Sequence, residues 1–128
     1  MQRLREKIDQ AGGIDIQLLG IGRTGHIGFN EPGSWQNSFT RLVRLDGITR
    51  QDAIKDFIHI EDVPYRAITM GIGSIMKARK IFLMGWGTTQ GNHYTACSRR
   101  RDHACDSSNF LQEHPNVRVY IDEAASGN

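Results

Sequence analysis

The feature that most constrains the fold of this chain is an apolar run, residues 14–19, that breaks into four glycines between residues 20 and 28. A short apolar run bounded by turn residues predicts a buried strand of a parallel sheet that leads into a loop. In open α/β sheets, ligands bind at the carboxyl ends of strands. The loop that follows the run is therefore the expected place for chemistry, and it carries His26 and Glu31.

The rest of the chain alternates between segments typical of strands and segments typical of helices. The expected strands cover residues 14–19, 40–45, 66–70, 80–86 and 117–121, and the expected helices cover residues 2–10, 49–57 and 75–79, with Thr49 and Ser74 as N-caps. This alternation predicts an α/β fold with a mostly parallel sheet flanked by helices. A chain of 128 residues has room for one modest core and hence for one domain.

The overall composition excludes several function classes. The net charge of +2 is too small to indicate a nucleic-acid partner. No apolar run approaches the ~18 residues that a membrane span needs, and the charged N-terminus has no apolar segment of a signal peptide. The two cysteines form no disulfide framework, so a cytoplasmic location with no membrane partner is expected.

Residues 88–109 do not fit the alternating pattern. No apolar period of 2 or 3.6 residues runs through them. A parallel sheet requires a crossover connection between the strand that ends at Trp86 and the strand that begins at Val117. The segment supplies the length of such a connection but only a thin apolar face, which argues against a well-specified local structure.

The same segment contains residues that could bind a metal or an anion. The spacing of its histidines and cysteines fits no common tetrahedral zinc pattern, so no metal site is predicted. Three arginines are followed by an aspartate and lack aromatic stacking partners, which favours a solvated charge run over a nucleic-acid site. These residues are His93, Cys97, His103 and Cys105, and the triplet Arg99, Arg100 and Arg101.

The glycines of the loop formally match a dinucleotide-binding fingerprint, with Gly20, Gly22 and Gly25 in the pattern G-x-G-x-x-G. That fingerprint requires a helix to open at the third glycine, so that the helix N-terminus meets the pyrophosphate. Gly28 and the Pro32-Gly33 turn prevent a long helix there. The loop is therefore not expected to bind a dinucleotide.

The whole loop, Gly20-Ile-Gly-Arg-Thr-Gly-His-Ile-Gly-Phe-Asn-Glu-Pro-Gly-Ser34, resembles the signature loop of the glucosamine-6-phosphate deaminase family. The likeness continues through residues 40–41, 63–64, 66–74, 80–86, 110–117 and 122–125. The sister 6-phosphogluconolactonases share a glycine-rich loop with histidine but typically end it differently, and Asn30-Glu31-Pro32 favours the deaminases. The resemblance implies a partial Rossmann-like fold that corresponds to the C-terminal half of the family domain, over residues 1–128.

The resemblance also implies an activity and a set of site residues. The family converts glucosamine 6-phosphate and water to fructose 6-phosphate and ammonia without a redox cofactor. His26 would open the sugar ring, because the pKa of histidine as a residue type lies near neutral pH, and Glu31 would fix its tautomer. The remaining assignments are Thr24 beside the histidine, and Gly22, Gly25, Arg41 and Lys55 in substrate binding.

Three positions depart from the family pattern. Thr24 stands where the family usually has an aspartate, so it can form a hydrogen bond but supplies no charge. Lys55 lies near the position at which the family has an arginine that binds the sugar phosphate. Lysine keeps the charge but cannot form the bidentate hydrogen bonds of a guanidinium. Gln90 falls where a phosphate-binding lysine is expected.

The upstream half of the family domain, with a phosphate loop and the aspartate base for the C2 proton, has no counterpart in these residues. The chain alone is therefore expected to show no deaminase turnover. A non-catalytic sugar-phosphate-binding remnant and a lactonase of the sister family remain as alternatives. The family is usually homo-oligomeric, and residues 88–109 are expected to be a frameshifted or decayed crossover helix that packs poorly.

Overall fold

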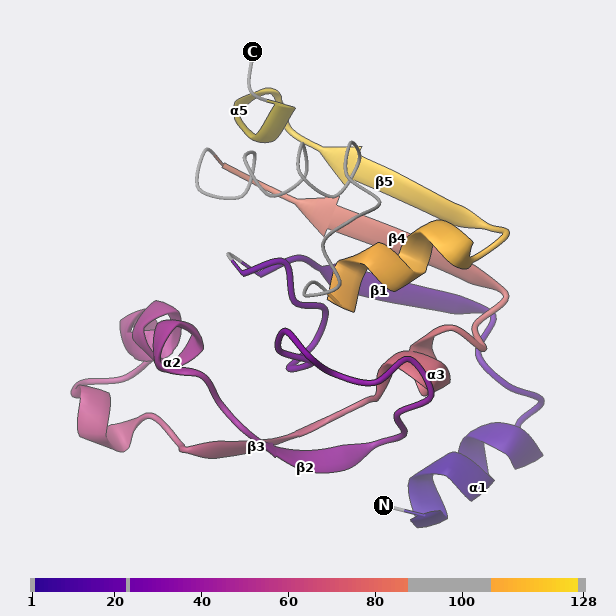
Figure 1. Ribbon diagram of the computed structural model, residues 1–128, viewed down its shortest axis with the longest axis horizontal. Coiled ribbons are helices and arrows are strands. Elements are labelled where there is room, and N and C mark those ends of the chain that lie inside the picture. Colours follow the sequence, from indigo (N-terminus) through magenta and orange to yellow (C-terminus); the bar gives the residue numbers. More distant parts are fainter. Residues whose placement is uncertain (1, 23, 88–106, 127–128) are drawn as a thin grey trace.

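The computed structural model of the protein describes residues 2–22, 24–87 and 107–126, and the structural statements below refer to these residues (Figure 1). A three-stranded parallel sheet has the order β1 (Ile16–Gly20), β4 (Lys80–Gly85) and β5 (Val117–Ile121). Leu19 pairs with Leu83, and Leu83 pairs with Val119. The predicted α/β class with a mostly parallel sheet is confirmed.

Two of the predicted strands do not join this sheet. β2 (Arg41–Arg44) and β3 (Arg66–Thr69) pair with each other in antiparallel register and form a separate two-stranded ribbon. Their residues are alternately exposed and half-buried, apart from the buried Thr69. Arginines at both ends of β2 suit a ribbon that is accessible to solvent.

Both predicted N-caps, Thr49 and Ser74, are wrong. The helix α2 (Gly47–Ala53) is capped by Asp46, whose carboxylate accepts a hydrogen bond from the backbone N–H of Ile48 at 2.8 Å. Asp46 precedes the helix and can reach its free N–H groups, whereas Thr49 lies within the first turn. The helix α3 (Ile72–Ile75) begins earlier than expected and contains Ser74, and the Ser38 hydroxyl accepts its first N–H at 2.9 Å.

The remaining elements are short. α1 (Gln2–Gln10) precedes β1, as predicted, and α5 (Glu123–Ser126) follows β5. The 3₁₀-helices are η1 (Ile54–Asp56), η2 (Ile60–Asp62) and η3 (Ser107–Glu113). η3 begins inside the segment predicted to lack structure, and Ser107 and Ser108 are buried. The rest of that segment, residues 88–106, lies outside the described residues.

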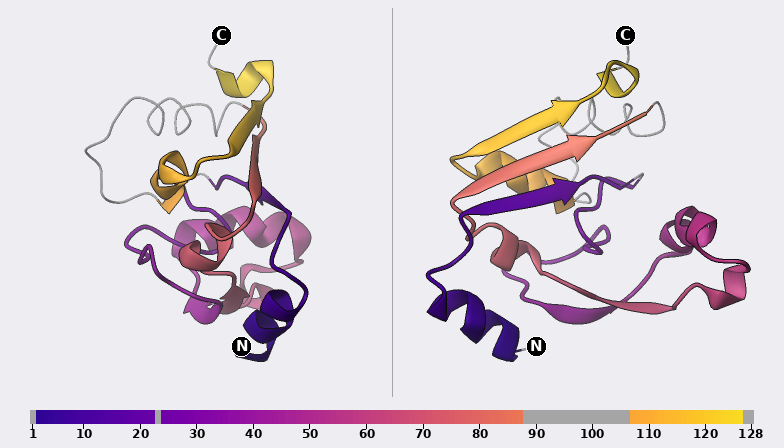
Figure 2. Two further views of the ribbon diagram at one scale, coloured as in Figure 1. Left: turned by 90° about the vertical axis from the view of Figure 1, so that its right-hand side faces the viewer. Right: turned by 180° about the vertical axis from the view of Figure 1, so that it is seen from behind.

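The hydrophobic core lies on one face of the parallel sheet. Its buried members are Leu19, Ile21, Ile27, Ile75, Ala78, Ile81, Leu83 and Leu111. Figure 2 shows η3 beside the sheet in both views, and Leu111 of η3 belongs to this core. On the opposite face, Ile16 and Leu18 of β1 are more than half exposed. The core therefore fixes the end of β1 and the loop that follows it.

No helix among the described residues has both the length and the apolar character needed to cross a bilayer.

Candidate active site

The glycines after β1 let the chain fold back on itself and bring His26 over Gly22. The N–H of Gly22 donates to the carbonyl of His26 at 2.9 Å, and the N–H of Gly25 donates to the carbonyl of Gly22 at 2.9 Å. Gly25 has a φ of +75°, which favours glycine. A Cβ atom at Gly22 would overlap the His26 imidazole around Nε2, so the position of the ring requires glycine there.

His26, Glu31 and Thr24 form one hydrogen-bonded cluster. Nδ1 of His26 lies 3.3 Å from Oε2 of Glu31 and 2.9 Å from Oγ1 of Thr24. The side chains of His26 and Glu31 are 13 % and 18 % exposed, so water has limited access to the pair. The structure therefore brings together the three residues that the sequence assigned to catalysis.

The two oxygen atoms around Nδ1 determine where the neutral imidazole carries its proton. A carboxylate only accepts hydrogen bonds, so a proton on Nδ1 satisfies Oε2 of Glu31. The Thr24 hydroxyl donates to the same Oε2 at 3.5 Å, which leaves its oxygen to accept from Nδ1. With the proton on Nε2 instead, the Nδ1 lone pair would face the lone pairs of both oxygens. The cluster therefore favours the tautomer with N–H at Nδ1 and a free lone pair at Nε2, as in other histidines oriented by a carboxylate.

A fourth residue, which sequence reasoning missed as a site residue, contacts this cluster. The hydroxyl of Thr49 donates to Oε1 of Glu31 at 2.5 Å, and Thr49 is 6 % exposed. Both carboxylate oxygens of Glu31 therefore have partners within the protein. The contact joins the loop after β1 to α2, across 18 positions of the sequence. No spacing pattern in the sequence indicates such a contact.

Asn30 is the buried polar centre of the loop, with 0 % exposure. Its amide Nδ2 donates to the carbonyls of Ile27 at 2.9 Å and Met70 at 2.8 Å, and its Oδ1 accepts from Arg41 Nη1 at 2.9 Å. Arg41 also donates to the Ser34 hydroxyl at 3.1 Å. The guanidinium that was assigned to substrate binding is thus engaged in holding the loop.

Two hydroxyl groups from distant elements hold the backbone of the same loop. Ser107 accepts from the N–H of Ile27 at 3.1 Å and donates to the carbonyl of Asn30 at 2.6 Å. Thr69 accepts from the N–H of Phe29 at 3.0 Å. Because buried backbone groups without partners are costly, these hydroxyls specify the path of the chain from residue 27 to residue 30.

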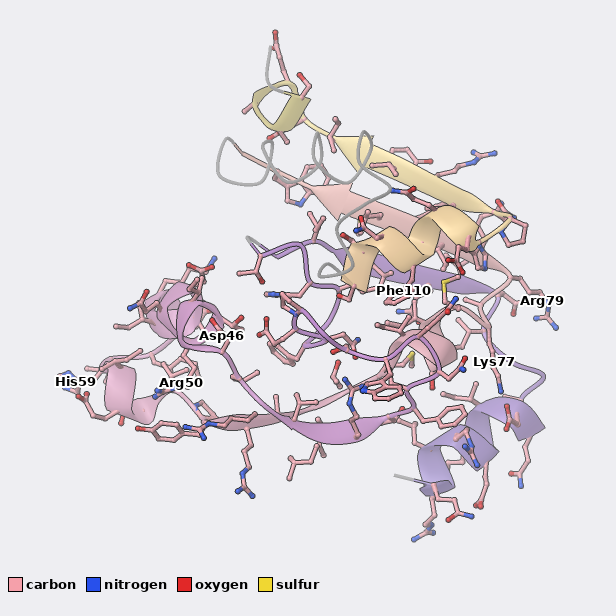
Figure 3. All side chains as sticks on the ribbon, viewed as in Figure 1. Asp46, Arg50, His59, Lys77, Arg79 and Phe110 are labelled. Atoms are coloured by element: carbon pink, nitrogen blue, oxygen red, sulfur yellow. The ribbon has the colours of Figure 1, made fainter. Side chains whose placement is uncertain are left out.

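Lys55, the last residue assigned to substrate binding, is exposed on η1. Among the described residues, no recorded hydrogen bond or ion pair joins it to the histidine loop. α2, which precedes η1, is anchored by Arg50, whose Nη2 donates to the carbonyls of Ile60 at 2.9 Å and Val63 at 3.0 Å. Figure 3 shows Arg50 at the same end of the molecule as Asp46 and His59. In the described part of the chain, no three metal-ligating side chains cluster, and the histidines and cysteines of residues 93–105 lie outside that part.

Comparison with curated proteins places this loop in a known family. The chain is 46 % identical over 121 residues to a glucosamine-6-phosphate deaminase of Corynebacterium aurimucosum, and this match covers 94 % of the chain and 48 % of that enzyme. The chain belongs to the glucosamine-6-phosphate deaminase family. A deaminase of Arthrobacter sp. is 43 % identical over 125 residues, a match that covers 98 % of the chain and 48 % of that enzyme. The chain thus spans about half the length of these relatives and matches their C-terminal part. No family model matches the chain.

Solved structures agree with this assignment. A monomeric glucosamine-6-phosphate deaminase superposes with a TM-score of 0.95 and 38 % identity, over 98 % of this chain and 52 % of that chain. A 6-phosphogluconolactonase from Trypanosoma brucei superposes with a TM-score of 0.69 and 19 % identity, over 89 % of this chain and 41 % of that one. The second likeness shows a shared fold. The sequence identity, 46 % and 38 % to two of the deaminases against 19 % to the lactonase, favours the deaminases.

Proposed function

We propose that this chain forms the ring-opening part of a glucosamine-6-phosphate deaminase site, which acts in the cytoplasm on a sugar phosphate without a redox cofactor. The observation that carries the proposal is the His26–Glu31 pair, with 3.3 Å between Nδ1 and Oε2, in a loop at the carboxyl end of β1. The similar proteins, which match 94–98 % of this chain, are glucosamine-6-phosphate deaminases, and this supports the proposed substrate. Residues 1–128 would form a single, partial domain of this type.

In the proposed mechanism, Nε2 of His26 removes the proton from the anomeric hydroxyl of the pyranose and delivers it to the ring oxygen. The bond between C1 and the ring oxygen breaks, and the open-chain aldehyde forms with no net change in protons. Glu31 stabilises the imidazolium while it carries the proton. Thr24 adds a hydrogen bond at Nδ1 and no charge.

The later steps move a proton from C2 to C1 and release ammonia with the uptake of water. The family resemblance assigns the base for the C2 proton to the upstream half of the domain. A general base typically contributes about 10²–10⁴-fold in rate. We therefore expect the chain by itself to show no deaminase turnover at rates typical of the family.

The substrate-binding roles of Gly22, Gly25, Arg41 and Lys55 belong to the same proposal. The glycines give the imidazole its position, and the lysine remains available on η1 for a phosphate. Arg41 lies beside a hollow that Glu31 and Ser34 also line. The homo-oligomeric state expected from the family stays a prediction, since the solved relative is described as monomeric.

A chimera tests the proposal. This chain would replace its 121-residue counterpart in the Corynebacterium aurimucosum deaminase, and ammonia and fructose 6-phosphate would be measured with glucosamine 6-phosphate as substrate. We expect turnover in the chimera and its loss in the His26→Ala variant, with ring-open substrate restoring part of the rate. Ammonia release by the unmodified chain alone would contradict the proposed division of the site.

The same assay separates the alternatives. Hydrolysis of 6-phosphogluconolactone by a chimera that releases no ammonia would favour the sister family, whose members share the fold. Binding of glucosamine 6-phosphate by calorimetry, without turnover in a folded chimera, would favour a non-catalytic sugar-phosphate-binding module. The observation that favours this second function is that the chain spans only about half the length of its relatives.

A further inference from the structure

The Glu31 carboxylate is the element of the site whose orientation needs explanation. Its Oε2 meets His26 and Thr24, and its Oε1 accepts the Thr49 hydroxyl at 2.5 Å. The terminal torsion of a glutamate side chain is broad, so contacts at one oxygen leave the carboxylate free to rotate. A second, short contact at the other oxygen removes that freedom.

The donor of this second contact is unusual for its place in the chain. A threonine within a helix commonly hydrogen-bonds the carbonyl three or four residues earlier, or faces solvent. Thr49 lies in the first turn of α2 and is buried, and its recorded hydrogen bond goes to Glu31 instead. The hydroxyl is therefore directed at the site.

We propose that Thr49 is a positioning residue: its hydroxyl fixes the Glu31 carboxylate so that Oε2 stays on Nδ1 of His26, which keeps the lone pair at Nε2 free. The hydroxyl can donate only one proton, and that proton goes to Oε1. Oε2 then remains an acceptor for the Nδ1 proton. The role of the free Nε2 rests on the proposed function, while the effect of Thr49 on the imidazole tautomer does not.

The rest of α2 holds Thr49 at the required place. Asp46 caps the helix, and Arg50 ties it to the carbonyls of Ile60 and Val63. Arg50 also lies 3.8 Å above the ring of Tyr65, in cation–π contact. The tautomer of a histidine at the end of β1 is thus set in part by a helix between β2 and β3.

Nitrogen NMR of the complete chain, labelled with ¹⁵N-histidine, tests the proposal without any turnover. The His26→Gln variant identifies the His26 signals among the five histidines. In the unmodified chain we expect the neutral His26 ring to be protonated at Nδ1. Thr49→Val keeps the shape of the side chain and removes the hydroxyl, and we expect the spectrum to change to a mixture of tautomers.

Two matched variants complete the experiment. Thr49→Ser retains a hydroxyl and should restore the pure Nδ1 tautomer, and Thr40→Val, next to α1, should leave it unchanged. A pure Nδ1 tautomer in Thr49→Val would overturn the proposal, as would a mixture in the unmodified chain. A second measurement needs no variant: the Thr49 hydroxyl proton should exchange slowly enough to be observed, and its absence from the spectrum would also count against the proposal.

Discussion

The parallel sheet and the β2–β3 arm, defined as residues 41–69, hold the same loop by different forces. The sheet region encloses fully buried aliphatic side chains such as Ile27 and Ile81. The arm exposes much of its apolar surface, with Ile68 at 62 % and Leu42 at 50 %. Hydrogen bonds join the arm to the loop: Arg41 and Thr49 donate to side chains of the loop, and the Thr69 hydroxyl accepts from the N–H of Phe29.

This difference teaches how the site divides its tasks. Apolar burial supplies most of the folding free energy, and it is not directional. It places the loop at the end of β1 without selecting how a carboxylate or an imidazole is turned. Hydrogen bonds are individually weaker in net free energy but depend on geometry. The arm therefore contributes orientation of the site more than stability of the fold.

The largest effect should come from the sheet side of this comparison. Ile27→Ala removes a side chain with 0 % exposure from the core cluster and leaves a cavity. We expect a loss of about 2–5 kcal/mol in the free energy of unfolding, measured by urea denaturation. Ile68→Ala on the exposed arm is the control and should change stability by only about 0.5 kcal/mol. Equal losses in both variants would show that the arm is part of the same core.

The sequence predicted the sheet because its pattern is local. β1 and β4 form close to the predicted apolar segments, residues 14–19 and 80–86. The predicted burial of the first strand is wrong for one of its faces, where Ile16 and Leu18 are exposed. The pairing of β2 with β3 was not predicted, since strand periodicity gives no information about which neighbour a strand chooses. The predictions of the caps of α2 and α3 were also wrong. Asp46, three residues before Thr49, accepts the Ile48 N–H of α2, and Ser38, which is distant in the sequence, accepts the first N–H of α3.

The candidate site divides in the same way. His26, Glu31 and Thr24 lie within eight positions in the sequence, and a motif could reveal them. Thr49 and Ser107 act across 18 and 80 positions, respectively. Ser107 also lies in the segment whose sequence has no clear periodicity. A single buried hydroxyl does not change the apolar periodicity of a sequence. Hydrogen bonds of this kind are therefore found only in the folded structure.

Asn30 lies where the two regions meet, and its removal should have the next largest effect. Asn30→Ala removes the side-chain donor of the Ile27 and Met70 carbonyls and the acceptor of Arg41. The two carbonyls keep the Asn30 N–H and the Thr69 hydroxyl as donors, so the cost is that of three lost hydrogen bonds, one of them to a charged guanidinium. We expect a net loss of roughly 2–3 kcal/mol. Asn116→Ala, at an exposed position, is the matched control. A negligible loss at Asn30 would mean that water replaces the amide.

Ser107 tests whether η3 supports the loop as strongly as the arm does. Ser107→Ala removes an acceptor from the Ile27 N–H and a donor from the Asn30 carbonyl, both of them buried. We expect a loss of about 1–2 kcal/mol, again from urea denaturation, whereas Ser126→Ala near the C-terminus should have almost no effect. Should the two serine variants prove equally stable, η3 would be a passive neighbour of the loop.

The smallest effect is expected within the arm itself, at the cap of α2. Asp46→Ala removes the acceptor of the Ile48 N–H, and loss of an N-cap costs about 1 kcal/mol. Because α2 lies between β2 and β3, which form a ribbon separate from the parallel sheet, hydrogen exchange should accelerate at the amides of α2 and remain unchanged in β1 and β4. The control is Asp9→Ala, near the end of the separate helix α1. Faster exchange throughout β4 would show that the arm and the sheet unfold together, and the division of tasks between them would then have to be abandoned.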